Sequence, residues 1–173
     1  MESETFLIRV SKLIQKSRKA VRLYSSQSRS AGEYTEYQFA EWREISSILL
    51  QGLASAMELP GNKRIVAEIF ALRDRFYSIY HSAEIDMRML KKELSHAVDS
   101  DQFAKAANLS IRLISLKARL QAAQSAHHEL QELLDNSHVV QPTIELTHTE
   151  VTEAPAKPVA KVIPLRRRSA GNQ

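Results

Sequence analysis

Cysteine is absent from this sequence, and glycine and proline are scarce in most of it. Without cysteine the chain has no disulfide framework, no thiolate metal site and no cysteine nucleophile. Four glycines are too few for a phosphate-binding loop or for the many turns of a β-sandwich or β-barrel. No apolar run approaches the ~18 residues that a membrane-spanning helix requires. We therefore expect no nucleotide-binding loop, no β-rich fold and no membrane span.

Proline divides the sequence into two parts. Four of the five prolines lie in the last 32 residues, and only Pro60 precedes them. Apolar residues make up 43% of the chain and charged residues 25%, the proportions of a globular chain with one hydrophobic core. We predict a helical bundle or coiled-coil hairpin domain over residues 1–136. Residues 137–173 have no helical period and are rich in Pro, Thr, Val and Ala, which favours a disordered tail.

Four segments of the predicted domain place apolar residues at alternating steps of three and four, the spacing of one helix face. They span about 3–27, 33–57, 63–98 and 101–136. The predicted buried stripe of the third segment consists of Ile65, Ile69, Leu72, Phe76, Ile79, Ala83, Leu90 and Ala97. That of the fourth segment consists of Leu109, Leu113, Leu116, Leu120, Ala123, His127, Leu130 and Leu134. Serines end the first segment, and Leu59-Pro60-Gly61 ends the second, because proline lacks the amide and glycine is flexible. The fold predicted is all-α: an antiparallel up-down-up-down four-helix bundle in which the third and fourth helices form a long helical hairpin.

The long hairpin is predicted to project past the shorter one. Its two arms are nearly equal in length, and Asp99-Ser100-Asp101 can turn the chain and cap the fourth helix through short oxygen-bearing side chains. Its far end, roughly residues 88–111, extends beyond the first two helices, and the apolar residues on or beside it have less cover: Met87, Met89, Leu90, Leu94 and Phe103. We expect a partner-binding hairpin tip there, formed by Met87, Leu90, Leu94 and Phe103.

Net charge alternates in sign along the predicted helices: +5 over residues 1–32, −4 over 33–62, +2 over 63–98 and −1 over 99–136. One face of the first helix carries Arg9, Lys12, Lys16 and Lys19. The simplest interpretation is that this face attracts the acidic second helix, which carries Glu33, Glu36, Glu41, Glu44 and Glu58.

An alternative interpretation makes the first helix a basic amphipathic surface for anionic membrane or nucleic acid. It requires four side chains to be free of the core: Phe6, Leu7, Ile14 and Leu23.

The same segment also has features of a targeting sequence. Between Thr5 and Gly32 there are seven basic residues and no acidic one, and Arg22-Leu23-Tyr24-Ser25 resembles the arginine-type cleavage site of mitochondrial presequences. Glu2 and Glu4 depart from that pattern. We expect a cytoplasmic protein, with the mitochondrial matrix as the alternative; in that case the mature chain would begin near Ser25.

Candidate metal and catalytic residues do not combine into a site. The Glu-x-x-His spacing of di-iron bundles occurs at Glu93–His96, near a helix end, and at Glu145–His148, in the tail, so the two pairs cannot share a buried metal. His127 falls on a leucine stripe and is predicted to pack between helices, where its charging near neutral pH could loosen the bundle. His128 and Glu132 lie one turn apart.

The aromatic residues of the second helix are predicted to form helix–helix contacts in preference to a ligand pocket; they are Tyr34, Tyr37, Phe39 and Trp42. We assign no catalytic residue, metal ligand or cofactor.

These patterns predict a non-enzymatic protein–protein interaction module of the adaptor, scaffold or chaperone-like kind. The partner is another protein, recognised by the hairpin tip and captured electrostatically by Arg166, Arg167 and Arg168 of the tail. Self-association into a homodimer through partly covered leucines belongs to the same interpretation. The alternative function is peripheral binding to anionic membrane or nucleic acid through the first helix and the tail.

Overall fold

The computed structural model describes residues 2–27 and 32–136, with the side chains of 5–27 and 35–136. Four helices make up almost all of this part: α1 (Glu2–Gln27), α2 (Glu33–Met57), α3 (Asn62–Asp99) and α4 (Phe103–Asp135). The predicted all-α four-helix fold is confirmed, and each helix end lies within one or two residues of its predicted position. The chain divides into Met1–Val139 and Val140–Gln173, and the predicted tail lies outside the described residues.

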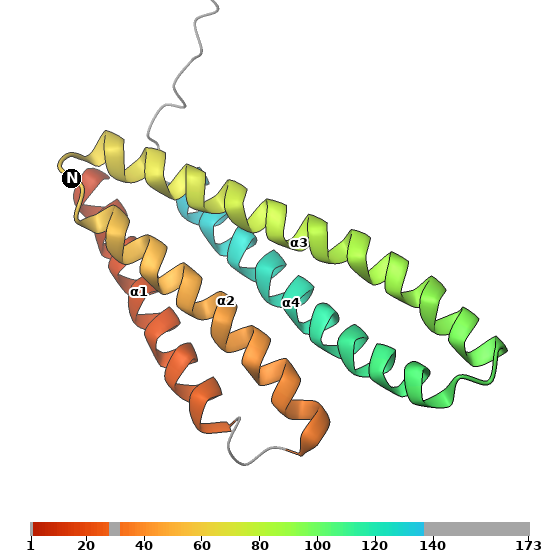
Figure 1. Ribbon diagram of the computed structural model, residues 1–173. Coiled ribbons are helices and arrows are strands. Elements are labelled where there is room, and N and C mark those ends of the chain that lie inside the picture. The colour runs from red at the N-terminus through yellow and green to blue at the C-terminus, as the bar shows by residue number, and fades with distance from the viewer. Residues whose placement is uncertain (1, 28–31, 137–173) are drawn as a thin grey trace, which may run out of the picture. The chain divides into compact units, whose positions relative to one another are not determined.

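The bundle consists of two antiparallel helical hairpins, α1–α2 and α3–α4 (Figure 1). Each helix packs along its hairpin partner, and the closest association between the hairpins is that of α2 with α4. Helix α1 touches α4 only lightly, and α2 contacts α3 less than it contacts α4. In Figure 1 the hairpins meet at the end where α2 joins α3 and diverge toward the other end. The two helices α2 and α4 therefore form a central pair, with α1 and α3 on its flanks.

The main hydrophobic core lies where the two hairpins meet and takes side chains from all four helices. Phe76 of α3 and Leu130 of α4 are fully buried at its centre, beside Leu53 of α2 and Val10 of α1. Seven of the eight side chains predicted for the α3 stripe are buried, and Ile79 is partly buried. On α4 the predicted stripe is only partly confirmed, because this helix packs against both α3 and α2. Leu109, Ala123, Leu130 and Leu134 of the stripe are buried, and Leu113, Leu116, Leu120 and His127 are half-buried. Buried residues outside the stripe are Ala106, Ala118, Ala126 and Leu133.

The far end of the long hairpin has a small core of its own. Leu90 and Ala97 of α3 pack with Ala106 and Leu109 of α4, and no residue of α1 or α2 belongs to this cluster of described residues. The end of the hairpin is therefore closed by its own side chains.

The turn between α3 and α4 differs from its predicted chemistry. Asp101 takes a left-handed conformation (φ 56°), the amide of Gln102 donates to the carbonyl of Ala97 at 2.8 Å, and the amide of Asp101 donates to that of Val98 at 3.1 Å. This is the Schellman arrangement that ends a helix. The aspartates were predicted to cap α4, but the N-cap of α4 is Gln102, which makes no side-chain capping bond. Asp101 instead ends α3, because aspartate tolerates positive φ better than most residues.

Two glycines shape the corner between α2 and α3. Gly61 has φ +89°, a conformation that side chains strongly disfavour, and its carbonyl accepts the first amide bonds of α3. Gly52 lies inside α2 against Leu72, where a β-carbon would come within 2.6 Å of the Leu72 Cδ1 atom. The missing side chain at Gly52 thus allows Leu72 to pack directly on the α2 backbone.

Candidate protein-binding surfaces

The four side chains predicted to form the hairpin tip differ in exposure. Leu90 is only 5% exposed and lies in the small core between α3 and α4, while Met87 and Leu94 are half-buried. Phe103 is 68% exposed at the start of α4. Leu90 therefore packs mainly within the hairpin, between α3 and α4.

Other apolar side chains of the long hairpin are exposed; of these, Met89 was expected to have little cover, and Ile85 and Val98 were not predicted. Met89 is 57% exposed, and Ile85 and Val98 are each 49% exposed. Ile85 and Met89 lie four residues apart, so they share one face of α3. The apolar stripe of α3 gave no indication of this face, because Met89 is only one residue from buried Leu90 and its position in the helix turns it 100° away.

Met89 borders a cleft of about 570 Å³, which we call the hairpin cleft. Tyr37, 40% exposed near the start of α2, faces it from the other hairpin. Helices α3 and α4 supply the rest of the lining: Asp86, Leu90, Glu93, Ile111, Arg112, Ser115 and Leu116. The cleft lies where α2 and the long hairpin diverge, and it combines apolar walls with charges of both signs.

Helices α1 and α2 pack together as predicted, but the predicted attraction between the basic face of α1 and the acidic residues of α2 is wrong, because the contacts of this face go to α4. Lys16 Nζ forms an ion pair with Glu129 Oε1 of α4 at 2.9 Å, and Arg9 donates a weaker bond to the carbonyl of Asn136 at 3.4 Å. Lys12 and Lys19 are exposed. No ion pair joins α1 to α2 among the described side chains.

The acidic residues of α2 also pair with α4. Arg119 of α4 contacts Glu41 at 3.2 Å and Glu44 at 3.4 Å, and the Ser115 hydroxyl donates to Glu41 at 2.6 Å. Helix α4 is therefore the electrostatic partner of both helices of the short hairpin, because α2 and α4 form the central pair.

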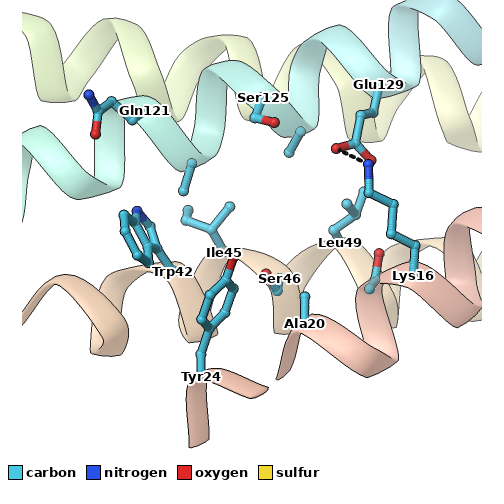
Figure 2. A pocket seen from close by; sticks show the side chains of 13 residues that line it. Lys16, Ala20, Tyr24, Trp42, Ile45, Ser46, Leu49, Gln121, Ser125 and Glu129 are labelled. Atoms are coloured by element: carbon cyan, nitrogen blue, oxygen red, sulfur yellow. Dashed lines mark hydrogen bonds and ion pairs between the residues drawn. The ribbon is translucent and has the colours of Figure 1, made fainter. Parts of the chain in front are cut away.

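A groove separates α1 from α4 above the floor formed by α2, and we call it the α1–α4 groove (Figure 2). The cavity within it has a volume of about 260 Å³. Figure 2 shows the Lys16–Glu129 pair at one end and Trp42 with Gln121 at the other. The remaining lining residues are Ser17, Ala20, Tyr24, Ile45, Ser46, Leu49, Ala122, Ser125 and Ala126.

The aromatic residues of α2 separate into two groups. Phe39 and Trp42 pack with Tyr24 of α1, with ring centroids 5.5–6.2 Å apart, so they connect the two helices of the short hairpin. Trp42 also lines the α1–α4 groove, and Tyr37 borders the hairpin cleft. The side chain of Tyr34 lies outside the described ones.

The apolar residues of α1 largely face the core. Phe6 is 2% exposed, and Leu7 and Ile14 pack against the main core, whereas Leu23 is 50% exposed. Three of the four side chains required for a membrane-inserting face are thus engaged within the bundle.

His127 lies in the seam between α3 and α4, as its stripe position predicted. Its ring is half-buried and packs against Tyr80 and Tyr77, with centroids 5.6 and 6.0 Å away. Burial lowers the pKa of His127 below its ordinary value, and the positive charge of Arg73 adds to this effect. Burial also raises the pKa of Tyr80. The neutral form of both groups is favoured in this seam.

Potential metal ligands do not gather in the part of the chain that the structure describes: no three His, Asp or Glu side chains there could hold one ion together. His96 is exposed at the end of α3, with Nδ1 3.5 Å from the Ser100 hydroxyl. His128 and Glu132 contact each other at 3.3 Å on the surface of α4. Glu145 and His148, and the three tail arginines Arg166, Arg167 and Arg168, lie outside the described residues.

Comparison with known proteins gives no relative: no protein-family model, no curated protein and no solved structure matches this chain. Among the described helices, none combines the length and the hydrophobicity needed to cross a membrane. The class is therefore defined by the fold and its surfaces: a four-helix bundle of two hairpins, with the hairpin cleft between α2 and the long hairpin and the α1–α4 groove beside the basic face.

Proposed function

We propose that this protein is a non-enzymatic protein–protein interaction module, of the adaptor, scaffold or chaperone-like kind, that binds its partner through the end of the α3–α4 hairpin. The observation that supports this most is the exposure of Met89 and Phe103 on a hairpin that is closed by its own core. Exposed apolar side chains of this size add binding free energy when a partner covers them, at ~25 cal/mol per Å² of apolar area.

The hairpin cleft gives this surface its specificity in the proposal. Tyr37 and Met89 offer apolar contacts, while Asp86, Glu93 and Arg112 set the charges that a partner must match. Aromatic and methionine side chains are enriched at protein interfaces. We further propose that Arg166, Arg167 and Arg168 of the tail capture acidic surfaces, which makes partner binding sensitive to salt.

Crosslinking capture with the full chain tests the hairpin surface. The double variant Met89→Glu/Phe103→Glu should lose the partners of the wild-type protein after nuclease treatment, because it places charge on the contact surface. Ile8→Glu is the matched control, since Ile8 is 49% exposed on α1, a helix of the other hairpin. Far-UV circular dichroism verifies that each variant is folded. Unchanged capture by the folded double variant would contradict the proposal.

A companion measurement separates the tail from the hairpin. Changing Arg166, Arg167 and Arg168 to alanine should remove only the partners that dissociate at moderate salt. Sedimentation of the wild-type protein at high concentration tests the homodimer, and a strict monomer would remove self-association from the proposal.

Binding to anionic membrane or nucleic acid through α1 is the second candidate function. It is favoured by four exposed cations that form no ion pair among the described side chains: Lys12, Arg18, Lys19 and Arg22. Co-sedimentation with anionic vesicles or oligonucleotides at low salt tests it, and absence of binding there eliminates it.

We place the function in the cytoplasm, with the mitochondrial matrix as the alternative. Phe6 and Val10 of α1 belong to the main core, which argues against removal of α1 from the mature chain. N-terminal sequencing of the protein purified from its cell tests the mitochondrial alternative, since processing would give a chain that begins near Ser25.

A further inference from the structure

The side of the bundle between α1 and α4 is open along much of its length. Besides the cavity of the α1–α4 groove, a second hollow of about 380 Å³ lies on the other side of the Lys16–Glu129 pair. Arg9, Lys12, Leu13 and Lys16 of α1 line it on one side, and Glu129, Glu132, Leu133 and Asn136 line it on the other. The opening is thus elongated, with the ion pair as a bridge between its two stretches. An elongated opening suits a linear occupant better than a compact one.

The groove itself is too small for a typical metabolite. Its cavity of about 260 Å³ lies below the ~300–1,000 Å³ of pockets for drug-sized ligands. Ile45 and Leu49 of α2 form an apolar floor, and the small side chains Ala20 and Ala122 leave room beside it. Such a space fits one or two apolar side chains of a helix that lies along α1 and α4, the arrangement in which an amphipathic helix anchors in a groove.

Charge on the α1 side of the opening specifies the occupant further. Lys12, Lys16, Lys19 and Leu23 follow one another at steps of four, three and four, so they share one side of α1. Lys16 of this row reaches α4, Lys12 lines the second hollow, and Lys19 is exposed beside the groove. Of the three lysines only Lys16 has an acidic partner among the described residues. On α4, the groove is bordered by Gln121 and Ser125, which are uncharged, and by Glu129, whose carboxylate is paired with Lys16. An occupant would therefore place acidic residues beside α1 and apolar or uncharged residues elsewhere.

We propose that the α1–α4 groove is a docking site for an acidic amphipathic helix of another protein, whose apolar side chains insert beside Trp42 while its carboxylates pair with Lys12 and Lys19. A membrane is a poorer occupant, because Phe6 and Ile14 are held by the core and only scattered apolar residues of α1 remain exposed. Nucleic acid would use the lysines and leave the apolar floor unused. This surface is separate from the end of the long hairpin, so either proposal can fail without the other.

The single tryptophan of the chain provides the readout. Trp42 lines the groove, so a helix that inserts there changes its fluorescence emission. The probe is a synthetic amphipathic peptide without aromatic residues, with leucines on one face and glutamates along its edges. We expect a saturable change of Trp42 emission on titration into the full-length protein, with weaker affinity at high salt. A peptide with lysine in place of glutamate, and one with the same composition scrambled, should give no saturable change.

Paired substitutions locate the site. Ser125→Glu adds a negative charge in the groove, and Lys19→Glu reverses a charge at its edge; each should weaken the peptide at least about tenfold, a loss of ~1.4 kcal/mol. Gln124→Glu and Arg18→Glu make comparable charge changes at exposed positions that do not line the groove. These controls should alter the dissociation constant less than about twofold. Met89→Glu/Phe103→Glu should bind the peptide like the wild type, which separates this site from the hairpin surface.

Three outcomes overturn the proposal. The first is the absence of a saturable response to the acidic peptide, and the second is equal weakening by the groove and control substitutions. The third is displacement of the peptide by anionic vesicles or by an oligonucleotide, if that competitor alone also changes Trp42 emission. The second would show diffuse attraction to the basic helix, and the third would assign the surface to a lipid or nucleic-acid ligand. Circular dichroism of each variant excludes unfolding as the cause of lost binding.

Discussion

Gly52 is the residue whose lack of a side chain matters most for packing in the short hairpin. Alanine is a better helix former than glycine by ~1 kcal/mol, but a β-carbon at this position would collide with Leu72, which is 5% exposed. Overpacking of a core typically costs ~1–3 kcal/mol. We predict that Gly52→Ala lowers the free energy of unfolding by ~1 kcal/mol in urea denaturation.

The Leu72→Ala background supplies the control. With the leucine side chain removed, the space beside Gly52 is free, and Gly52→Ala should then stabilise the protein by up to ~1 kcal/mol relative to Leu72→Ala alone. Stabilisation by Gly52→Ala in the wild-type chain would show that Leu72 does not limit the space at this position.

His127 makes the stability of the bundle depend on pH. Its pKa is lowered in the folded state, chiefly by burial, so the unfolded chain takes up the proton more readily. Stability is therefore complete above the ordinary histidine pKa of about 6.5 and decreases as the pH falls below it, until the folded-state pKa is reached. We predict a lower melting temperature at pH 5.5 than at pH 7.5.

The variant His127→Gln isolates this contribution, because other titratable groups lie near the ring: Arg73, Asp74, Tyr77, Tyr80 and His128. His81 and Glu84 lie one contact further away, beside Tyr77 and Tyr80. The difference in melting temperature between the two pH values should be smaller in His127→Gln than in the wild type. Equal differences in both proteins would assign the pH dependence to another group.

At the scale of the elements, α1 is the helix most weakly held. Three of its described residues are buried, Phe6, Val10 and Ser17, whereas α3 and α4 bury eight each. Most of its contacts are with α2, and Ser17 satisfies its hydroxyl within α1 by donating to the Leu13 carbonyl. Elements with few buried contacts open at low free energy.

Hydrogen exchange measures this difference. We predict that amides of α1 exchange fastest among the four helices and that those near Phe76 and Leu130, in the centre of the main core, exchange slowest. Equal protection in α1 and α3 would mean that the α1–α2 hairpin opens only with the whole bundle. Saturation with the acidic peptide should slow exchange in α1 if the proposed docking site exists.

For the whole molecule, the two hydrophobic cores predict that the end of the long hairpin can unfold before the rest of the bundle. Phe76→Ala removes a fully buried side chain from the main core and should lower the free energy of unfolding by ~3–5 kcal/mol. The unfolding transitions seen by circular dichroism and by Trp42 fluorescence should shift together.

Leu109→Ala weakens the small core of the hairpin end, to which α2 does not contribute. Its circular dichroism should decline before Trp42 fluorescence changes, and coincident transitions would show that the two cores unfold as one unit.

The helical content and the positions of the helices follow from local properties that the sequence contains. The Leu59-Pro60-Gly61 sequence ends a helix through its own local chemistry, and apolar steps of three and four define a buried face whatever lies opposite it. For this reason Ile69, Leu72 and Phe76 were identified as core residues, and the helix ends were predicted to within one or two residues. The difference in helix length also indicated that the long hairpin extends past the short one.

The tertiary structure alone decided which helix fills which face. The sequence placed opposite charges on the first two helices, yet Lys16 and Glu41 both pair with residues of α4, because α2 and α4 form the central pair. The burial of Leu90 in the small core between α3 and α4, and the groove next to Trp42, likewise depend on how the helices pack. Helical periodicity fixes the direction of a side chain within its own helix, whereas its neighbours depend on how four helices rotate and cross, which many weak contacts determine together.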